Sequence, residues 1–307
     1  MKYGISYGKK AVPIYRVYAK PLTGVIPIPE SRFTGRSNIL MAGEVDITVH
    51  GTDFLPAYLV GDNSNVVATD SMKNIIIEQA LSFDGSTLEH YLLTIGTNFI
   101  GMYEQIRDVE LEVRELPFPA SQVPDESGAF DQSDRLFARS GSDSGVARVH
   151  LVQSESGLEI VDHEVGRVGM KLLKVTGSSF TSFVRDEHTT LPDRKDRPLY
   201  IYLDIFWSYV TPEDGFSGSV QRYVPSEQIA DLATAVFHEF VSESIQHLVH
   251  EIGTRILDRF PQLGNVRFVA ENRTRDPFGQ SQQRPEVKVY SDPFPAFGEI
   301  TLSMSRS

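Results

Sequence analysis

Two segments of the chain repeat the same pattern at a constant offset of 157 residues. Residues 86–113 align without a gap on residues 243–270, so that His90 falls on His247 and the glycines and threonines that follow also coincide. Self-similarity at a fixed offset indicates a structural unit that occurs more than once. The repeat therefore restricts the chain to folds built from two tandem copies of one unit.

Each copy is predicted to contain two strands, a helix pair and two further strands, which is an α+β arrangement. Residues 44–50 and 107–114 alternate apolar and polar side chains, as in a strand with one buried and one wet face. Between them, residues 70–82 and 86–103 carry apolar side chains at helical spacing. We therefore expect two units, 1–155 and 156–307, each with an antiparallel sheet that has helices on one face.

Other segments give less regular signals. Residues 118–146 are rich in Gly, Ser, Asp and Pro and are expected to form a loop. In the second half, strands are expected near 158–163, 169–184 and 198–210, and the last strand within 286–304. The run PLYIYLDIFWSYV is apolar on both faces, so its strand is expected to be covered on both sides.

The sheets of the two units would have open edges, which tend to pair with other strands. A closed ring of sheets removes such edges. We therefore expect a homo-oligomeric barrel with a hydrophilic lumen.

Composition narrows the function classes. The 307 residues are 40% hydrophobic and 23% charged, as in ordinary soluble globular proteins. The chain has no cysteine, which excludes disulfides and thiolate chemistry, and its net charge of −12 argues against nucleic-acid binding. No apolar run is long enough to cross a membrane and the N-terminus has no signal-like segment, so a cytoplasmic location is expected. His247 and His250 do not form a metal-binding spacing with Glu251, so no metal site is expected.

The stretch GDNSNVVATDSMKN, residues 61–74, is the first candidate for a functional motif. A short apolar run leads into a helix at Thr69 and Asp70. The free N–H groups at a helix start favour small anions. The alternative is that Thr69 and Asp70 only cap the helix, because such residues precede most helices.

Two segments of the second half are unusually rich in polar and aromatic residues. They are SSFTSFVRDEHTTLPDRKDRPLY, residues 178–200, and SESIQHL, residues 242–248. Taken alone, Arg197 is interpreted as a surface ion-pair residue and Gln246 as a residue on a helix face. Neither segment contains a Walker loop or a nucleophile elbow.

Together these segments resemble the urate oxidase (uricase) family, and its bacterial branch in particular. The matching motifs cover most of the chain and are YGK at 7–9, GDNSNVVATDSMKN at 61–74, SSFTSFVRDEHTTL at 178–191, DRPLY at 196–200 and SESIQ at 242–246. The resemblance implies the tunnelling fold, with two tandem units in each subunit, four subunits around a tunnel and active sites between subunits. It also implies oxidation of urate by O₂ and water to 5-hydroxyisourate and hydrogen peroxide, without a cofactor.

The resemblance also assigns roles to residues. One subunit would supply Lys9 and Thr69, which form a proton-moving dyad, and the backbone N–H of Asp70. From the neighbouring subunit, Phe180 would stack on the urate rings and Leu191 would line the pocket. Arg197 and Gln246 would make polar contacts to the two edges of urate. Ile245 would add a backbone contact, and the amide of Asn272 would lie above the ring. These residue types suit a planar anion that has donors and acceptors along its edges.

The chain departs from the family pattern at three positions. Many members have a His two residues after the Asn, in the relay with the dyad, whereas this chain has Thr274. A threonine cannot change its charge near neutral pH. Pro198 takes the place of a pocket Ile, and His188 stands where relatives usually have Tyr or Phe.

Two alternatives stay open beside an active urate oxidase. One is a purine-binding oligomer that has lost the proton relay, which Thr274 suggests. The other is a tunnelling-fold enzyme that acts on pterins. Such enzymes are expected to carry an acidic anchor near the start of the second helix, where this chain has Gln246.

Overall fold

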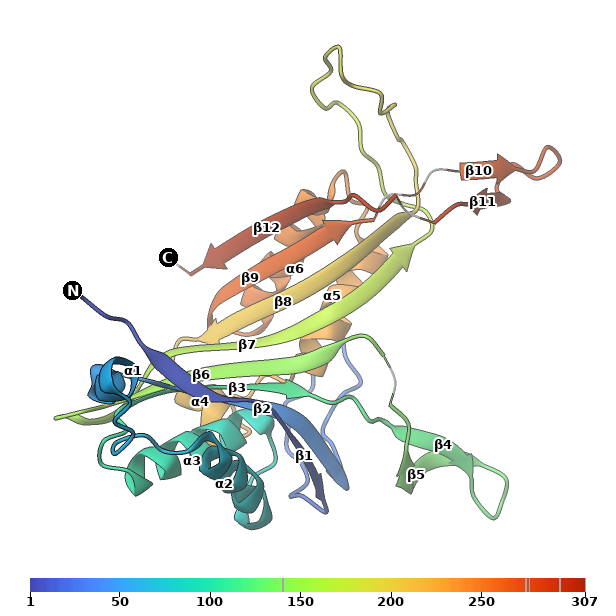
Figure 1. Cartoon of the computed structure of the whole chain (residues 1–307). Coiled ribbons are helices and arrows are strands. Elements are labelled where there is room, and N and C mark those ends of the chain that lie inside the picture. Colours follow the sequence, from blue (N-terminus) through green and yellow to red (C-terminus); the bar gives the residue numbers. More distant parts are fainter. Residues whose placement is uncertain (140, 274, 276, 293, 307) are drawn as a thin grey trace.

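The computed structural model describes residues 1–139, 141–273, 275, 277–292 and 294–306. Eight strands form one antiparallel sheet in the order β1-β2-β3-β6-β7-β8-β9-β12 (Figure 1). Their bounds are Ser6–Val17, Leu40–His50, Asp108–Glu115, Ser144–Ser154, Gly157–Lys174, Leu199–Tyr209, Leu263–Asn272 and Gly298–Ser305. The two predicted antiparallel sheets are thus continuous in the single chain.

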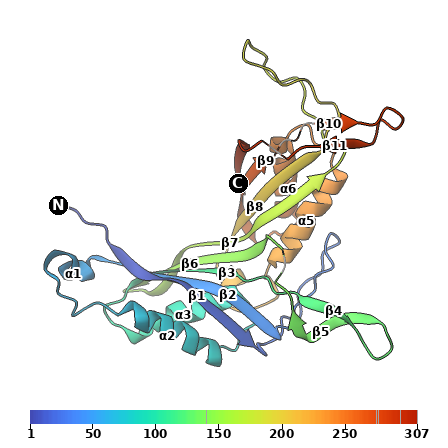
Figure 2. The same ribbon diagram turned by 45° about the vertical axis from the view of Figure 1, so that its right-hand side comes forward.

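Four long helices cover one face of this sheet. The pair α2 (Thr69–Ser82) and α3 (Leu88–Met102) lies against the first half, and the pair α5 (Ser226–Glu239) and α6 (Ile245–Arg259) lies against the second half (Figures 1 and 2). Short helices are η1, α1 and α4, at Thr52–Phe54, Leu55–Val60 and Glu213–Phe216. The inward side chains of both halves form one buried apolar cluster.

The order of elements repeats as the sequence predicts. When the small hairpins and short helices are set aside, β1 to β6 contain two strands, a helix pair and two further strands. The elements from β7 to β12 follow the same order. β6 pairs directly with β7 across the tight turn after Ser154. The division into units 1–155 and 156–307 coincides with this turn and, as a domain boundary, stays a prediction.

Several local predictions are wrong. Residues 118–146 are not a plain loop, because β4 (Ala120–Pro124) and β5 (Phe130–Phe137) pair as a hairpin beside the main sheet. The two strands expected within 158–184 are one long strand, β7, which continues through a bulge between Arg167 and Met170. The C-terminal strand β12, at Gly298–Ser305, agrees with the expected range 286–304, but a second hairpin that no sequence pattern predicts joins β10 (Pro277–Gln280) to β11 (Lys288–Tyr290).

The strand β8 is covered fully on only one side. Its residues alternate between buried and partly exposed, so the prediction of two covered faces is wrong for the single chain. On the open face, the Arg267 guanidinium lies 4.0 Å from the centre of the Phe206 ring and Lys171 Nζ lies 4.9 Å from that of Tyr202. These cations cover apolar rings that the sequence pattern had assigned to packing.

The sheet is open, with β1 at one edge and β12 at the other. A single chain therefore does not close the expected ring. Both edges offer unpaired backbone groups to a further strand.

The first strand of each half has the same irregularity. β1 has a bulge between Lys9 and Val12, where Ala11 has φ +55° and its N–H donates to Asp46 Oδ1 at 2.6 Å. β7 has its bulge 158 residues later, and there the N–H of Gly169, with φ +79°, donates to Asp204 Oδ1 at 2.6 Å. A bulge changes the direction in which the neighbouring side chains point.

Candidate functional site

Lys9 lies in β1 directly before the bulge and is partly buried. The glycine before it is required by a close approach of two strands, since a Cβ on Gly8 would lie 2.0 Å from the carbonyl oxygen of Ile47. The YGK motif thus combines a glycine that lets β1 pack tightly with a lysine whose direction the bulge sets.

Tyr7 connects this strand to the start of α2. Its hydroxyl accepts the backbone N–H of Val67 at 3.1 Å, and its ring packs edge-on against Phe54 with 5.1 Å between ring centres. Val67 lies two residues before Thr69, the first residue of α2. The hydrogen bond therefore fixes the segment that carries Thr69 relative to the strand that carries Lys9.

The capping interpretation of Thr69 and Asp70 is wrong. The N-cap residue of α2 is Ala68, which has no side chain that could accept a hydrogen bond, and Thr69 is already helical. Asp70 is exposed and pairs with Lys73 at 2.5 Å. Contact with Lys73, together with the more distant charge of Lys9, lowers the pKa of Asp70. The start of α2 therefore lacks the usual side-chain cap, in keeping with a role in binding.

Arg197 forms the centre of a second group of predicted residues. It is 8% exposed, and its Nε is buried with no hydrogen-bond partner in the described part of the chain. Burial, and then the charge of Arg194, lower its pKa, although an arginine stays protonated. A buried guanidinium nitrogen without a hydrogen-bond partner costs free energy.

Phe180 lies beside Arg197. The guanidinium carbon of Arg197 is 5.4 Å from the centre of the Phe180 ring, which stacks on Phe183 at 5.0 Å and 11°. Backbone hydrogen bonds hold the segment in place, from Arg197 N–H to the Ser178 carbonyl and between Phe180 and Arg194 in both directions. A flat ring and a guanidinium are thus side by side.

Gln246 lies in the first turn of α6 and is exposed, whereas Ile245 before it is buried. The Ser179 N–H donates to the Ser242 carbonyl at 2.8 Å, so the segment with Phe180 is tied to the residues that lead into α6. Phe180, Arg197, Ile245 and Gln246 therefore belong to one local assembly. We call these four residues the clamp half, and Lys9 with Thr69 the dyad half.

The remaining predicted residues lie around the clamp half or outside it. Asn272 is the last residue of β9 and pairs in register with Ile201. The N–H of Arg273 donates to the carbonyl of Tyr200. Asn272 is therefore beside residues that follow Arg197 by three and four positions. Leu191 is partly buried in the segment before Arg197. His188 is exposed beside Glu187, at 3.5 Å, and the structure gives it no further role. Pro198 is partly buried, and Thr274 lies outside the described residues.

The dyad half and the clamp half do not meet within the chain. No hydrogen bond, ion pair or ring contact joins them among the described residues. The dyad half belongs to β1 and α2, and the clamp half to the loop after β7 and the start of α6, which lie at different ends of the molecule in both views (Figures 1 and 2).

Sequence reasoning missed three features of this region. The sequence marks Tyr7 and Gly8 only as parts of the YGK motif, and no local pattern indicates the network of charged residues around Arg36 and Glu89. The repeat offset could have indicated the network, since Glu89 aligns with Gln246. A cavity of about 410 Å³ adjoins this network, at the junction of the two halves of the sheet and away from Lys9 and Arg197.

Among the described residues no group of three or more His, Asp or Glu side chains is placed to hold a metal ion. None of the helices in the described ranges is both long and apolar enough to span a membrane.

Comparison with known proteins places this arrangement in a family. The family model described as Uricase matches residues 46–150 and 163–301. A uricase from Haloferax volcanii is 49% identical over 271 residues, which cover 88% of each chain, and one from Halalkalicoccus jeotgali is 44% identical over 99% of this chain and 98% of its own. The crystal structure of urate oxidase from Bacillus sp. TB-90 superimposes with a TM-score of 0.95 at 43% identity, and covers 99% of this chain and 100% of that one. The chain belongs to the uricase family.

Proposed function

We propose that the chain catalyses the oxidation of urate by O₂ and water to 5-hydroxyisourate and hydrogen peroxide, without a cofactor. Membership of the uricase family makes it an enzyme of urate oxidation. The assignment of products and of residue roles goes beyond this membership and rests on the chemistry of the two halves.

The observation that carries the proposal is the state of Arg197. A guanidinium that is 8% exposed, with a buried Nε that has no partner, lies beside the Phe180 ring. An anionic, planar ligand would satisfy both features at once, because the fork of an arginine pairs with two adjacent acceptors and an aromatic face holds a ring flat. Urate is such a ligand.

The other edge of urate would meet the start of α6. Gln246 is exposed there, and its amide can donate and accept in the same plane. The amide of Asn272, at the end of β9, is proposed to lie above the ring and to hold O₂ or water. Leu191 and Ile245 would complete the pocket through packing and a backbone contact.

The proton transfers are assigned to the dyad half. A urate anion that loses a further proton becomes rich enough in electrons to reduce O₂ directly. The Lys9 amine and the Thr69 hydroxyl would accept that proton and return protons to the peroxide that leaves. The uncapped start of α2 would present the N–H of Asp70 to the anion.

The separation of the two halves supports a site between subunits. Each chain presents a dyad half and a clamp half at different ends of an open sheet, so a complete site needs two copies. A homotetramer in which sheets pair at the β1 and β12 edges would close a tunnel and unite the halves.

The non-catalytic alternative differs in one outcome, because a purine-binding oligomer would bind urate and release no peroxide. Lys9 and Thr69 favour catalysis. The pterin alternative is disfavoured by Gln246, since an amide cannot supply the negative charge of an acidic anchor.

The decisive experiment is an aerobic urate assay with the purified protein across a range of pH. We expect loss of the near-ultraviolet absorbance of urate together with stoichiometric hydrogen peroxide, in protein freed of added metals and flavins. Urate binding without peroxide would select the non-catalytic alternative, and an absence of both would refute the proposal.

A further inference from the structure

The internal repeat assigns a counterpart to each residue of the dyad half. Lys9 pairs with Ile47 directly before the bulge of β1, and 158 residues later Arg167 pairs with Ile205 directly before the bulge of β7. Thr69 is the first residue of α2, and Ser226 is the first residue of α5. An arginine and a serine thus occupy the places of the lysine and the threonine.

The clamp half has counterparts in the first half of the chain. The isolated bridge between Phe180 and Arg194 recurs 158 residues earlier between Leu22 and Arg36. The N-cap residues Ser244 of α6 and Thr87 of α3 each accept the N–H three residues further on. Gln246, two residues after its cap, therefore corresponds to Glu89.

Unlike the two halves of the urate site, these counterparts meet within one chain. Ser226, Glu89, Arg36, Glu115 and Tyr223 line a single space of only about 20 Å³, which is room for about one water molecule. The Arg167 guanidinium reaches Ser226 Oγ at 3.5 Å. Dyad counterpart and clamp counterpart thus face each other at the junction of the two units.

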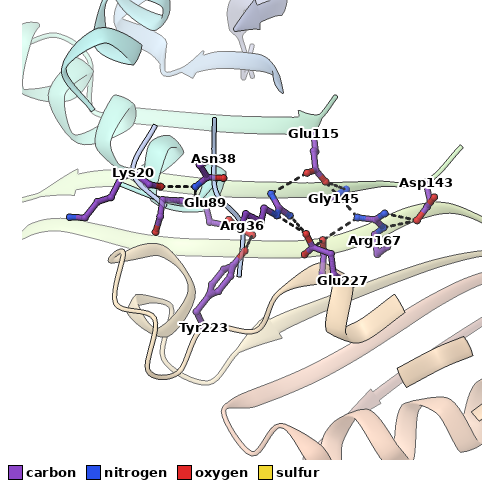
Figure 3. A network of polar contacts seen from close by, with 12 residues as sticks. Lys20, Arg36, Asn38, Glu89, Glu115, Asp143, Gly145, Arg167, Tyr223 and Glu227 are labelled. Atoms are coloured by element: carbon purple, nitrogen blue, oxygen red, sulfur yellow. Dashed lines mark hydrogen bonds and ion pairs between the residues drawn. The ribbon is translucent and has the colours of Figure 1, made fainter. Parts of the chain in front are cut away.

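The Arg36 guanidinium lies among the side chains that line this space. It pairs with Glu115 at 3.1 Å and donates from Nε to Glu227 at 2.6 Å (Figure 3). Tyr223 donates to Glu89 at 3.1 Å, and Arg167, which pairs with Asp143 at 2.5 Å, also lies 3.5 Å from Glu115.

The residue exchanges reverse the charge that the space accepts. The repeat counterpart of Arg197 is Ile39, 158 residues earlier, so the junction lacks the guanidinium that would hold an anion. The counterpart of the neutral Gln246 is the acidic Glu89. Two further carboxylates, Glu115 and Glu227, pair with the Arg36 guanidinium. A planar cation with several donors satisfies such a set of acceptors.

We propose that the junction of the two units is an internal counterpart of the urate site, changed from an anion site into a guanidinium site, and that Arg36 occupies it as a built-in ligand. The proposal rests on the assignment of the dyad half and the clamp half to urate. Its consequence is mechanical, because the filled site locks the two units together and so fixes the angle at which each chain presents its two halves to neighbours.

The buried charges agree with a permanent occupant. Burial alone would lower the pKa of Arg36, but Glu227 and Glu115 raise it above its ordinary value. Burial raises the pKa of Glu89 to about 7, and the nearby charge of Arg36 opposes this rise. Removal of Arg36 would leave the partly buried Glu227 without its ion-pair partner and Glu115 with only Arg167, at 3.5 Å, which is a destabilising change.

The test asks whether methylguanidinium restores the stability of the Arg36→Ala variant. The melting temperature is measured in the absence of urate. R36A should melt on the order of 5–10 °C below the parent chain. Methylguanidinium at about 10 mM should restore a large part of this loss in a saturable way, while equal concentrations of sodium or methylammonium chloride should not. The matched control is R148A, which also removes an arginine from two carboxylates, Glu110 and Asp162, but on the open face of the sheet.

The proposal would be overturned if methylguanidinium did not raise the melting temperature of R36A, or if it raised that of R148A equally. If R36A folds under neither condition, Arg36→Lys decides. Because lysine keeps the positive charge, R36K should fold with a clearly smaller loss of melting temperature. If R36K failed to fold as completely as R36A, a cation site would be rejected. Because the readout needs no urate, failure of the proposed oxidation would leave this result unaffected, and a negative result here would leave the oxidation untouched.

Discussion

At the scale of single residues, the molecule separates two uses of positive charge. The Arg36 side chain is 26% exposed and pairs with two carboxylates, whereas Arg197 is 8% exposed and its Nε has no hydrogen-bond partner among the described residues. Both are arginines in loops before a strand, so the difference comes only from the partners that each meets in space.

Substitutions of Lys9 and of Arg197 should therefore affect different kinetic constants. We expect Lys9→Met to lower kcat on the order of 10²–10⁴-fold with little change in KM, because it removes a proton-transfer group. Arg197→Gln should raise KM by about 10–100-fold, because it removes a charged hydrogen-bond donor from the ligand. Steady-state urate kinetics measure both.

Matched controls for these variants are Lys2→Met and Arg135→Gln, at exposed positions apart from both halves. Both should be close to the parent enzyme. A K9M variant with full kcat would show that the lysine is not part of the relay.

A second residue-scale prediction concerns Glu89 and pH. Burial raises the pKa of Glu89 to about 7 from its ordinary 4.5, in an environment formed by Arg36, Tyr223 and Glu227. Because the folded state holds the proton more tightly, this contribution to stability is fully present below pH 4.5 and is lost as the pH rises to about 7. The loss amounts to about 3 kcal/mol.

Glu89→Gln removes the titration, so its melting temperature relative to the parent chain should rise between pH 5 and pH 8. Paired thermal melts at the two pH values measure this difference. Glu78→Gln, at an exposed position of α2, should show no such change. A parent chain that gains stability relative to E89Q as the pH rises would contradict the assignment.

At the scale of elements, each half uses a tyrosine hydroxyl to hold the segment before its first long helix. Tyr7 accepts the N–H of Val67 before α2 at 3.1 Å, and Tyr209 accepts the N–H of Val224 before α5 at 3.0 Å. The first of these helices begins at Thr69 and the second at Ser226. The same device thus supports a dyad residue in one half and its counterpart in the other.

Tyr7→Phe keeps the ring on Phe54 and removes only the tie to Val67. We expect kcat to fall about 5–20-fold and its pH profile to shift, because about 1–2 kcal/mol of positioning between Lys9 and Thr69 is lost. Steady-state kinetics across pH measure this. Tyr209→Phe loses the same kind of hydrogen bond and should lower the melting temperature with the pH profile unchanged, so equal kinetic effects of the two variants would assign Tyr7 a purely structural role.

At the scale of the whole molecule, the open sheet and the separated halves favour the proposed site between copies of the chain. We expect K9M and R197Q to complement each other when co-assembled. A mixed pair has one site in which both halves are intact and one in which both are altered. With random pairing, about a quarter of the parent activity should return.

Mixtures of the separately folded variants, which have not exchanged subunits, are the control and should stay at the sum of their individual activities. Co-assembled protein that also stays at this sum would place the complete site within one chain.

Much of the fold could be read from the sequence because it depends on local periodicity. The alternation in residues 44–50 became β2, and the apolar stripe in residues 86–103 became α3. The hairpin β4–β5 was missed because its residues are polar and almost none is buried, so no apolar pattern marks its strands. The coverage of β8 was misjudged because Arg267 and Lys171 come from other strands.

The sequence alone indicates a doubled unit, and its motifs predict the residue types that would bind urate. Both follow from covalent order, through the repeat offset and the motifs. Contacts in the folded chain make Thr69 the first residue of α2 rather than its cap, leave Arg197 Nε without a hydrogen-bond partner among the described residues, and bring Arg36 to Glu115 and Glu227. The physical reason is that burial and pairing of a polar group depend on contacts between residues distant in the chain, which local sequence does not encode.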